Sequence, residues 1–343
     1  MSENGNEPKD ENKYKIELHS ITNDNTVYNP FSPNQIQNNS NNSHNEIQEI
    51  HRPYLNEIQN QGPKQTNLNN NDNISNNNNS NIQEKKESNN KSNYELALEY
   101  ENFLRQEIEQ TTPLISEQLE IKILLNEYKD NLEYSDSVKK ISEKYKYIRK
   151  VRRDGNCFYR AYIYRLFEMI CMKNDKILYE KVLKKIEESK EITKKNGYDW
   201  IVVEDFYNTF YSEFCNCFNC VTNSGISVRD YLDNLFSDKD KGQYLIYFIR
   251  FCIASYLKEN YLIYEVYIED EFNNWIQKEV EAIDHEADQI QIMACVNYFD
   301  IGVKIEYLNP HKSEEMKFPE DKKDDEIFIN VLFTPGHYDI LYP

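Results

Sequence analysis

The residues in this sequence best suited to covalent chemistry are a cysteine near its middle and a histidine near its end. Cys157 follows Asp154-Gly155-Asn156 and opens an apolar, helix-like run in RRDGNCFYRAY (152–162). A cysteine nucleophile needs a lowered thiol pKa and hydrogen-bond donors for the oxyanion it creates. A thiol at a helix N-terminus feels the positive end of the helix dipole and lies near free backbone N–H groups. The placement suits a nucleophile, although a small buried core thiol is the commoner role for cysteine.

The loop before the cysteine adds to the case for catalysis. Gly155 permits a tight turn, so the backbone amides of residues 154–157 can converge on a developing oxyanion. Asp154 can cap the helix or orient the loop. Cys157 therefore has a plausible oxyanion site beside it, and a base remains to be found.

His337 is the best placed of the six histidines. Three of the others precede residue 93 in an Asn-rich region, and His285 and His311 lie in polar segments that we expect to face solvent. His337 starts a strand-like run after a Pro-Gly turn, and Asp339 two residues later points to the same face. A carboxylate there can fix the imidazole tautomer and stabilise the imidazolium. The sequence predicts a triad of Cys157, His337 and Asp339.

The other cysteines indicate packing. All seven lie after residue 150, and their odd number suits reduced thiols in the cytoplasm or nucleus. Cys215, Cys217 and Cys220 are awkwardly spaced for a metal site and have no second Cys or His pair nearby. We expect Cys217 to join a buried helical stripe, and Cys171, Cys252 and Cys295 to lie in the core. No cofactor or metal is expected, and with only eight glycines in the chain a nucleotide-binding fold is not expected either.

Composition divides the 343 residues into two parts. Residues 1–92 are rich in Asn and poor in aromatic and β-branched residues, so we expect them to be disordered. Residues 93–343 contain enough Tyr, Phe, Ile and Leu for one sizeable core. We divide this domain into a helical N-terminal extension, 93–150, and a catalytic core, 151–343.

Charge and hydropathy exclude several classes of partner. The formal net charge of −19 argues against nucleic acid or an anionic membrane surface and suits a basic protein partner. The first residues, MSENGNEPKDENK, lack the apolar core of a signal peptide. The most apolar run, 244–257, is too short for a membrane span and carries Arg250, so it predicts a buried helix.

Periodicity places these residues on an α+β fold. Apolar spacing predicts many helices before residue 300. We expect them at 93–110, 116–130, 135–145, 157–172, 175–190, 204–221, 228–236, 242–258, 270–282 and 286–298. The end of the chain changes to strand-like patterns at 303–308, 327–333 and 337–342. Helical layers packed on a small, mostly antiparallel sheet are the expected architecture.

Two segments resemble the cysteine and histidine boxes of the ovarian-tumour (OTU) deubiquitinases. They are RKVRRDGNCFYRAY (149–162) and FTPGHYDILY (333–342), and the match is specific to the otubain branch. The resemblance extends over about 93–343 and includes 113–128, 139–150, 203–210, 244–257 and 279–294. It implies a papain-like cysteine protease fold and, from matching positions, Cys157 as nucleophile, His337 as general base and Asp339 as the residue that orients it. Asp154 matches the family's loop aspartate beside the oxyanion hole.

The resemblance also implies a reaction and partners. Otubains hydrolyse the isopeptide bond between ubiquitin and a lysine without a metal or cofactor, and tend to prefer chains linked through ubiquitin's lysine forty-eight. They hold the second ubiquitin partly on the N-terminal helix, here 93–110. Some also bind charged ubiquitin-conjugating enzymes and block them without catalysis. Ubiquitin, polyubiquitin and conjugating enzymes are therefore the expected partners.

The chain departs from the family pattern at two places. Arg153 stands where otubains usually carry Pro, which we expect to loosen the loop. Gln289 and Gln291 lie where relatives tend to have histidines near bound ubiquitin. Two alternatives to ubiquitin hydrolysis stay open: a non-catalytic regulator that binds ubiquitin or a conjugating enzyme, and an isopeptidase for a ubiquitin-like modifier.

Overall fold

The computed structural model describes residues 93–310, 313–321 and 328–343. All of them belong to one unit of the chain, residues 73–343. The expected disorder of residues 1–92 lies outside the described residues, and so does His311.

A six-stranded sheet supports the candidate histidine. Its strand order is β1-β2-β6-β5-β3-β4, and β3 pairs with β5 in parallel while the other four pairs are antiparallel. The strands are β1 (Leu119–Glu120), β2 (Tyr147–Arg149), β3 (Gly302–Leu308), β4 (Ser313–Phe318), β5 (Phe328–Thr334) and β6 (His337–Tyr342). The expected α+β fold with a mostly antiparallel sheet is confirmed.

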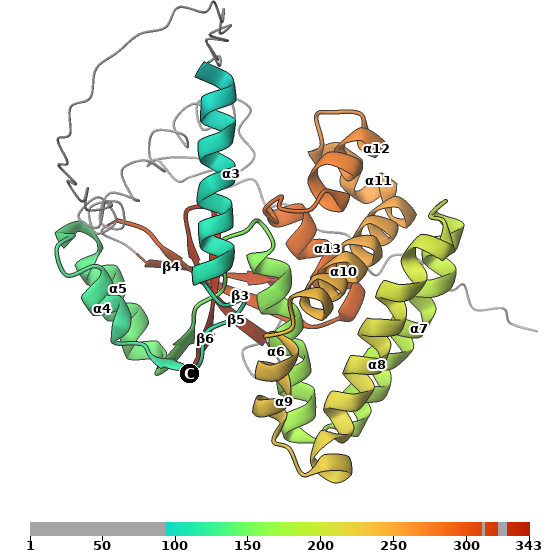
Figure 1. The fold of residues 1–343 in the computed structure, drawn as a ribbon, viewed down its shortest axis with the longest axis horizontal. Coiled ribbons are helices and arrows are strands. Elements are labelled where there is room, and N and C mark those ends of the chain that lie inside the picture. Colours follow the sequence, from blue (N-terminus) through green and yellow to red (C-terminus); the bar gives the residue numbers. More distant parts are fainter. Residues whose placement is uncertain (1–92, 311–312, 322–327) are drawn as a thin grey trace, which may run out of the picture. The chain divides into compact units, whose positions relative to one another are not determined.

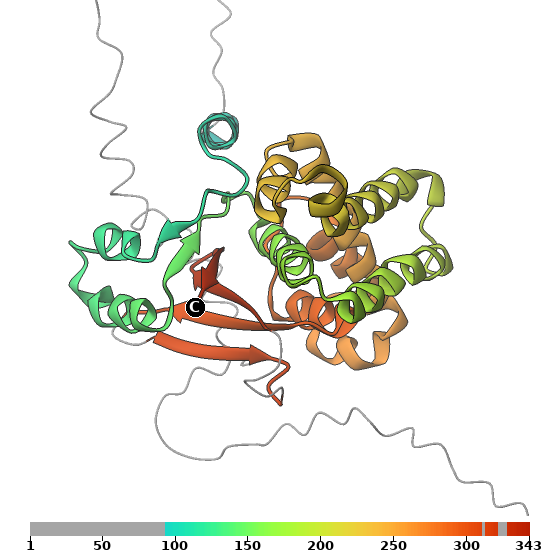
Figure 2. The ribbon, with the colours of Figure 1, turned by 90° about the horizontal axis from the view of Figure 1, so that it is seen from below.

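The helices pack on both faces of this sheet, as the two views in Figures 1 and 2 show. Alternation along β6 explains the two layers, because Ile340 packs into a large core with α6 and Leu341 packs into a small core with α4 and α5. The helices are α3 (Asn93–Thr111), α4 (Ile123–Glu127), α5 (Ser135–Lys144), α6 (Cys157–Lys173), α7 (Lys176–Lys195), α8 (Trp200–Ser224), α9 (Val228–Leu235), α10 (Lys239–Glu259), α11 (Tyr261–Tyr264), α12 (Phe272–Trp275) and α13 (Gln289–Phe299).

The helix expected at 116–130 is wrong in its first half. Leu119 and Glu120 pair with Ile148 and Tyr147 as strand β1, and only α4 is helical. The backbone of this segment bonds to β2 because the exposed edge of β2 offers unpaired donors and acceptors. Strands β1, β2 and β4 were not predicted, since strands this short or this polar show too little alternation to recognise. The extension 93–150 therefore contains two strands besides its helices.

Two further differences from the expected helices bear on the candidate site. The expected helix at 270–282 is α12 followed by a π-helix, Ile276–Glu281. The last expected helix begins three residues late, at Gln289, where Asp288 and Gln291 form a capping box. Residues 282–288 are consequently a loop, and this loop lies against the candidate site.

The apolar run 244–257 lies in α10, as expected. None of the helices in the described residues is long and apolar enough to cross a membrane. The thiols expected to pack do so: Cys171, Cys252, Cys295 and Cys217 are all buried, and Cys217 lies on one stripe of α8 with Phe210 and Phe214.

Candidate active site

Cys157 is the first residue of α6, and its side chain is almost fully buried, with 2% of the residue exposed. Burial raises the pKa of the thiol to about 12, because the charged form loses its hydration, while a hydrogen bond from the backbone N–H of Tyr338 favours the thiolate. The sulfur thus lies against the residue that follows His337. Residues 157 and 337, 180 positions apart in the chain, belong to adjoining elements, since α6 packs on β6.

Asp154 orients the loop before Cys157. Its carboxylate accepts hydrogen bonds from Arg160 Nη1 at 2.8 Å and Nη2 at 2.7 Å, a bidentate ion pair with a guanidinium that is 1% exposed. Asp154 Oδ1 also accepts from the N–H of Asn156 at 3.1 Å. The Asn156 side chain makes no cap hydrogen bond at the start of α6. In this conformation the Asn156 amide is engaged by Asp154, so it is not presented to a substrate oxygen.

Arg250 of α10 joins this loop to residues 282–288. Its guanidinium donates to Asn156 Oδ1 at 2.7 Å and to the carbonyl of His285 at 2.7 Å. Gly155 has φ of +73°, and a Cβ there would lie 2.0 Å from the carbonyl oxygen of Asp284. The loop 282–288 therefore covers the turn before Cys157 so closely that only glycine fits.

His337 and Asp339 form a buried pair at the start of β6. Their side chains point to the same face, and His337 Nε2 lies 2.9 Å from Asp339 Oδ1. Burial raises the pKa of Asp339, but His337, Lys150 and the N–H of Val151 outweigh it and hold that pKa well below its usual range. Burial also lowers the pKa of His337, against the raising effect of Asp339. The pair therefore has the neutral imidazole and ionised carboxylate that a general base and its orienting acid need.

The two halves of the predicted triad adjoin without a hydrogen bond. Because Asp339 takes Nε2, the atom left for the Cys157 proton is His337 Nδ1, which is buried and has no hydrogen-bond partner. Catalytic hydrogen bonds often close only when substrate binds. The arrangement has the composition of a triad in a resting geometry.

The departures from the family pattern have local explanations. Arg153 Nη2 donates to Thr334 Oγ1 at 3.1 Å, and Thr334 pairs with His337 across strands β5 and β6. This bond ties the loop to the strand that precedes the histidine. Gln291 is buried: its Oε1 accepts from the backbone N–H of Asp288 in the capping box of α13, and its Nε2 donates to the carbonyl of Glu279. His285 is half exposed and lies 3.4 Å from Glu279, in agreement with its expected position at the surface.

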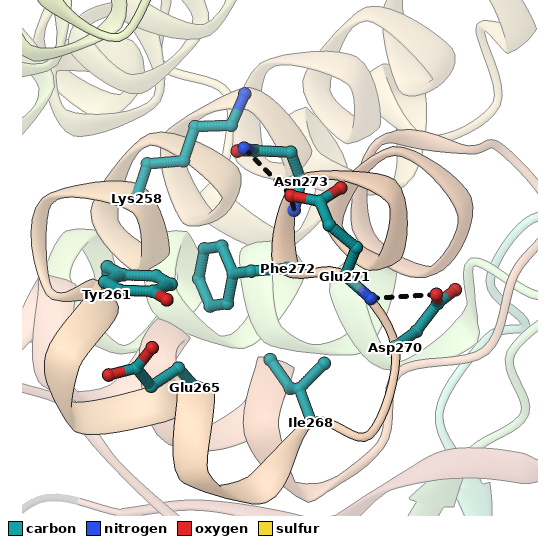
Figure 3. A pocket seen from close by; sticks show the side chains of 8 residues that line it. All are labelled: Lys258, Tyr261, Glu265, Ile268, Asp270, Glu271, Phe272 and Asn273. Atoms are coloured by element: carbon teal, nitrogen blue, oxygen red, sulfur yellow. Dashed lines mark hydrogen bonds between the residues drawn. The ribbon is translucent and has the colours of Figure 1, made fainter.

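A cavity of about 520 Å³ lies away from these residues (Figure 3). It opens between the end of α10 and the start of α12, where the rings of Tyr261 and Phe272 meet edge to face with centroids 4.8 Å apart. None of its lining residues belongs to the predicted triad. No group of three or more His, Cys, Asp or Glu side chains arranged for a metal ion occurs in the described residues.

Several residues of the site were not recognised from sequence. Arg160, Arg250 and Lys150 all contact the triad or its loop. Lys150 and Arg160 lie in the segment 149–162 around Cys157, but the sequence patterns predicted no role for them. One signal was present: Arg160 and Arg250 interrupt otherwise apolar helices, and a buried Arg needs acceptors close by.

Comparison with known proteins identifies the family of the chain. The family described as Peptidase C65 Otubain matches residues 107–343. The chain is 33% identical over 250 residues to "Ubiquitin thioesterase OTUB1" of Homo sapiens, covering 70% of this chain and 86% of the relative. It is 30% identical over 264 residues to "Ubiquitin thioesterase otubain-like" of Caenorhabditis briggsae, covering 72% and 88%.

The chain belongs to the otubain family.

Otubains are cysteine peptidases of family C65, so the chain is a ubiquitin thioesterase. Solved structures support the same fold. A complex of h/ceOTUB1 with ubiquitin aldehyde and UBC13~Ub superimposes with a TM-score of 0.66 at 24% identity, over 73% of this chain and 98% of that one. A complex with ubiquitin aldehyde and UBCH5B~Ub gives a TM-score of 0.65 at 25% identity, with the same coverage.

Proposed function

We propose that this otubain hydrolyses isopeptide bonds between ubiquitin and lysine by a Cys157-His337-Asp339 triad within a single catalytic domain, residues 93–343. The observation that carries the proposal is the buried His337–Asp339 pair, in which His337 Nδ1 has no hydrogen-bond partner. The next residue, Tyr338, donates its backbone N–H to the Cys157 sulfur. Nucleophile, base and orienting acid thereby adjoin, although they come from positions 157, 337 and 339 of the chain.

The chemistry follows from these positions. His337 Nδ1 takes the proton of Cys157, and the thiolate attacks the carbonyl of the ubiquitin C-terminal glycine. Asp339 holds the ring with its proton on Nε2 and stabilises the imidazolium. His337 then protonates the leaving lysine amine, and water, deprotonated by the same ring, hydrolyses the thioester.

The loop before α6 supplies the expected donors for the oxyanion. Backbone N–H groups of residues 154–157 are the nearest donors for a negatively charged oxygen beside Cys157. The N–H of Asn156 is bound to Asp154 Oδ1 in the free protein. For this amide to serve the oxyanion, substrate binding would have to release it, and the positive φ of Gly155 is where the turn can rotate.

A mechanism-based reagent tests the reaction. Ubiquitin with a thiol-reactive group at its C-terminus should form a covalent adduct with the wild-type protein and none with Cys157→Ser. His337→Gln should reduce the rate of adduct formation strongly, and Asn297→Ala, on α13, serves as a matched control. Absence of an adduct on folded wild-type protein refutes the catalytic proposal. Adducts with a ubiquitin-like modifier in place of ubiquitin indicate the modifier isopeptidase instead.

We further propose a preference for chains linked through lysine forty-eight, with the second ubiquitin held partly by α3. This helix exposes Tyr100 and Phe103, at 56% and 59%, and exposed aromatic side chains on one helix suit a protein partner. A panel of di-ubiquitins of defined linkage measures the preference. Tyr100→Ala with Phe103→Ala should slow cleavage of the preferred dimer while leaving reaction with the mono-ubiquitin reagent unchanged.

A non-catalytic role is a second candidate for the same protein. Ile201 and Val202 at the start of α8 are 82% and 57% exposed. Val202 also lines a small apolar cavity of about 250 Å³, together with Phe206 and Tyr247 among others. Such a surface suits a protein partner, and the relatives' complexes contain UBC13~Ub and UBCH5B~Ub. If Ile201→Asp abolishes binding of a charged conjugating enzyme but leaves chain cleavage intact, both functions operate; if the enzyme does not bind wild type, this role is excluded.

A further inference from the structure

Asp339 is held from three directions. Its Oδ1 accepts from His337 Nε2 at 2.9 Å and from the backbone N–H of Val151 at 2.8 Å. Its Oδ2 lies 3.3 Å from Lys150 Nζ. The carboxylate is buried, with 4% of its side chain exposed, so each of these contacts replaces hydration that the charge has lost. The acid that orients His337 is thus itself oriented by its neighbours.

Lys150 is itself held by contacts of its side chain and its backbone. Its Nζ lies 2.8 Å from Glu127 Oε2, at the end of α4. Its backbone N–H donates to Ser116 Oγ and its carbonyl accepts from the N–H of Ser116, both at 2.8 Å. A free lysine side chain carries about 2 kcal/mol of rotamer entropy, which opposes a fixed ion pair. Here the segment 116–127 holds both the backbone and the ammonium group in place.

We propose that Lys150 is a positioning residue of the reaction, which fixes the rotation of Asp339 and through it His337, and that Glu127 holds Lys150 in place. The inference rests on the proposed triad. Contacts on both oxygens, from Val151 N–H on one and Lys150 on the other, prevent the carboxylate from turning about its Cβ–Cγ bond. Oδ1 then stays on His337 Nε2, and Nδ1 stays free for the thiol proton.

The ammonium group also acts on the imidazole through its charge. Several ionisable groups face His337 from the elements packed around it. They are Asp339 of β6, Lys150 beyond β2, Arg153 of the loop before α6, Glu286 of loop 282–288 against Gly336, and the Cys157 thiol of α6. Burial lowers the pKa of His337 most, Asp339 raises it, and Arg153 and Lys150 lower it further. Lys150 therefore helps keep the base unprotonated near neutral pH.

The contact of the Lys150 ammonium group with Asp339 makes the N-terminal extension, residues 93–150, part of the catalytic apparatus. Glu127 and Ser116 lie well before residue 151, where the catalytic core was expected to begin. Both act on Asp339 only through Lys150. The extension accordingly supports the triad itself, in addition to any contact it makes with a second ubiquitin.

Lys150→Met tests the proposal, because Met keeps the length of the chain and removes the charge. We expect kcat for di-ubiquitin cleavage to fall about 10- to 100-fold, the loss that follows when a catalytic group is displaced by on the order of 1 Å. The Michaelis constant should stay near the wild-type value, since in this proposal Lys150 acts on Asp339 and not on the substrate. Lys150→Arg, which keeps the cation, should recover most of the activity. Lys146→Met is the matched control, because Lys146 lies exposed four residues earlier.

A measurement without turnover separates this inference from the proposed function. The imidazole pKa of His337 is followed by NMR and assigned by its absence from His337→Gln. It should change in Lys150→Met, where loss of the ammonium charge raises it and loosening of the Asp339 bond lowers it, and stay unchanged in Lys146→Met. If Lys150→Met does not fold, Lys150→Gln takes its place. If Lys150→Met has the wild-type kcat and an unchanged imidazole pKa, the role of Lys150 is refuted and the proposed triad is not affected. A wild-type protein that does not react through Cys157 overturns the triad, whereas the imidazole titration still reports on Lys150.

Discussion

Asp154→Asn is the sharpest test of how the cysteine loop is held. The substitution keeps the size of the side chain but removes the charge that pairs with Arg160, and it turns one oxygen into an NH2 group that faces a guanidinium donor. Arg160 is 1% exposed, so water cannot replace the lost partner. Two unit charges about 4 Å apart interact by about 4 kcal/mol at an effective dielectric constant of about 20.

The expected destabilisation is about 3 kcal/mol. Removing one partner of a buried ion pair costs about 3–5 kcal/mol, and the lower end applies because the Asp154 side chain is 18% exposed. Urea unfolding followed by far-ultraviolet circular dichroism gives the free energy of unfolding. In a domain of this size, the midpoint of thermal unfolding should fall by roughly 6–12 °C.

Asp136→Asn provides the control and the refutation. Asp136 lies 3.8 Å from Lys139, and both side chains are more than 60% exposed. Exposed pairs of this kind contribute about 0–1 kcal/mol. If Asp154→Asn destabilises the protein no more than Asp136→Asn does, the reasoning about a buried, loop-fixing ion pair is refuted.

Two further predictions concern the same loop. Gly155→Ala should destabilise the protein far more than Gly197→Ala. Both residues have positive φ, which costs about 1–2 kcal/mol for alanine, but only a Cβ at 155 meets Asp284. Equal decreases in the free energy of unfolding of the two variants would contradict the close packing at Gly155. Iodoacetamide should alkylate Cys157 of the free protein slowly at pH 7 and about tenfold faster per pH unit above it, because only the thiolate reacts and burial raises the thiol pKa to about 12. Fast alkylation that is independent of pH above pH 6, measured by mass spectrometry, would rule out a protonated resting thiol.

Local sequence patterns predicted the candidate reactive residues better than they predicted the residues that hold them in place. The helix that Cys157 opens and the strand that places His337 and Asp339 on one face depend on short-range periodicity, which a single sequence displays. The fold class followed from the same patterns, and the family comparison confirms it. The triad itself, as distinct from the geometry of its members, stays a prediction.

Only the tertiary structure decided which groups the charged side chains pair with. The sequence shows Arg160, Arg250 and Lys150 but not what they pair with. Their acceptors lie between six positions away, for Arg160 and Asp154, and 189 positions away, for Lys150 and Asp339. Strands β1 and β2 likewise become strands by pairing with each other and with β6. Hydrogen bonds between distant segments leave no periodic trace in either segment, so composition and spacing cannot reveal them.

The sequence by itself therefore predicted which residues react, and it showed the local elements that carry them. The tertiary structure decided their state: a buried, protonated thiol, an imidazole already paired with its acid, and a loop closed by Asp284 over Gly155. The physical reason is that reactivity depends on residue type and local backbone, whereas pKa and access depend on burial and on charges brought together by the whole fold.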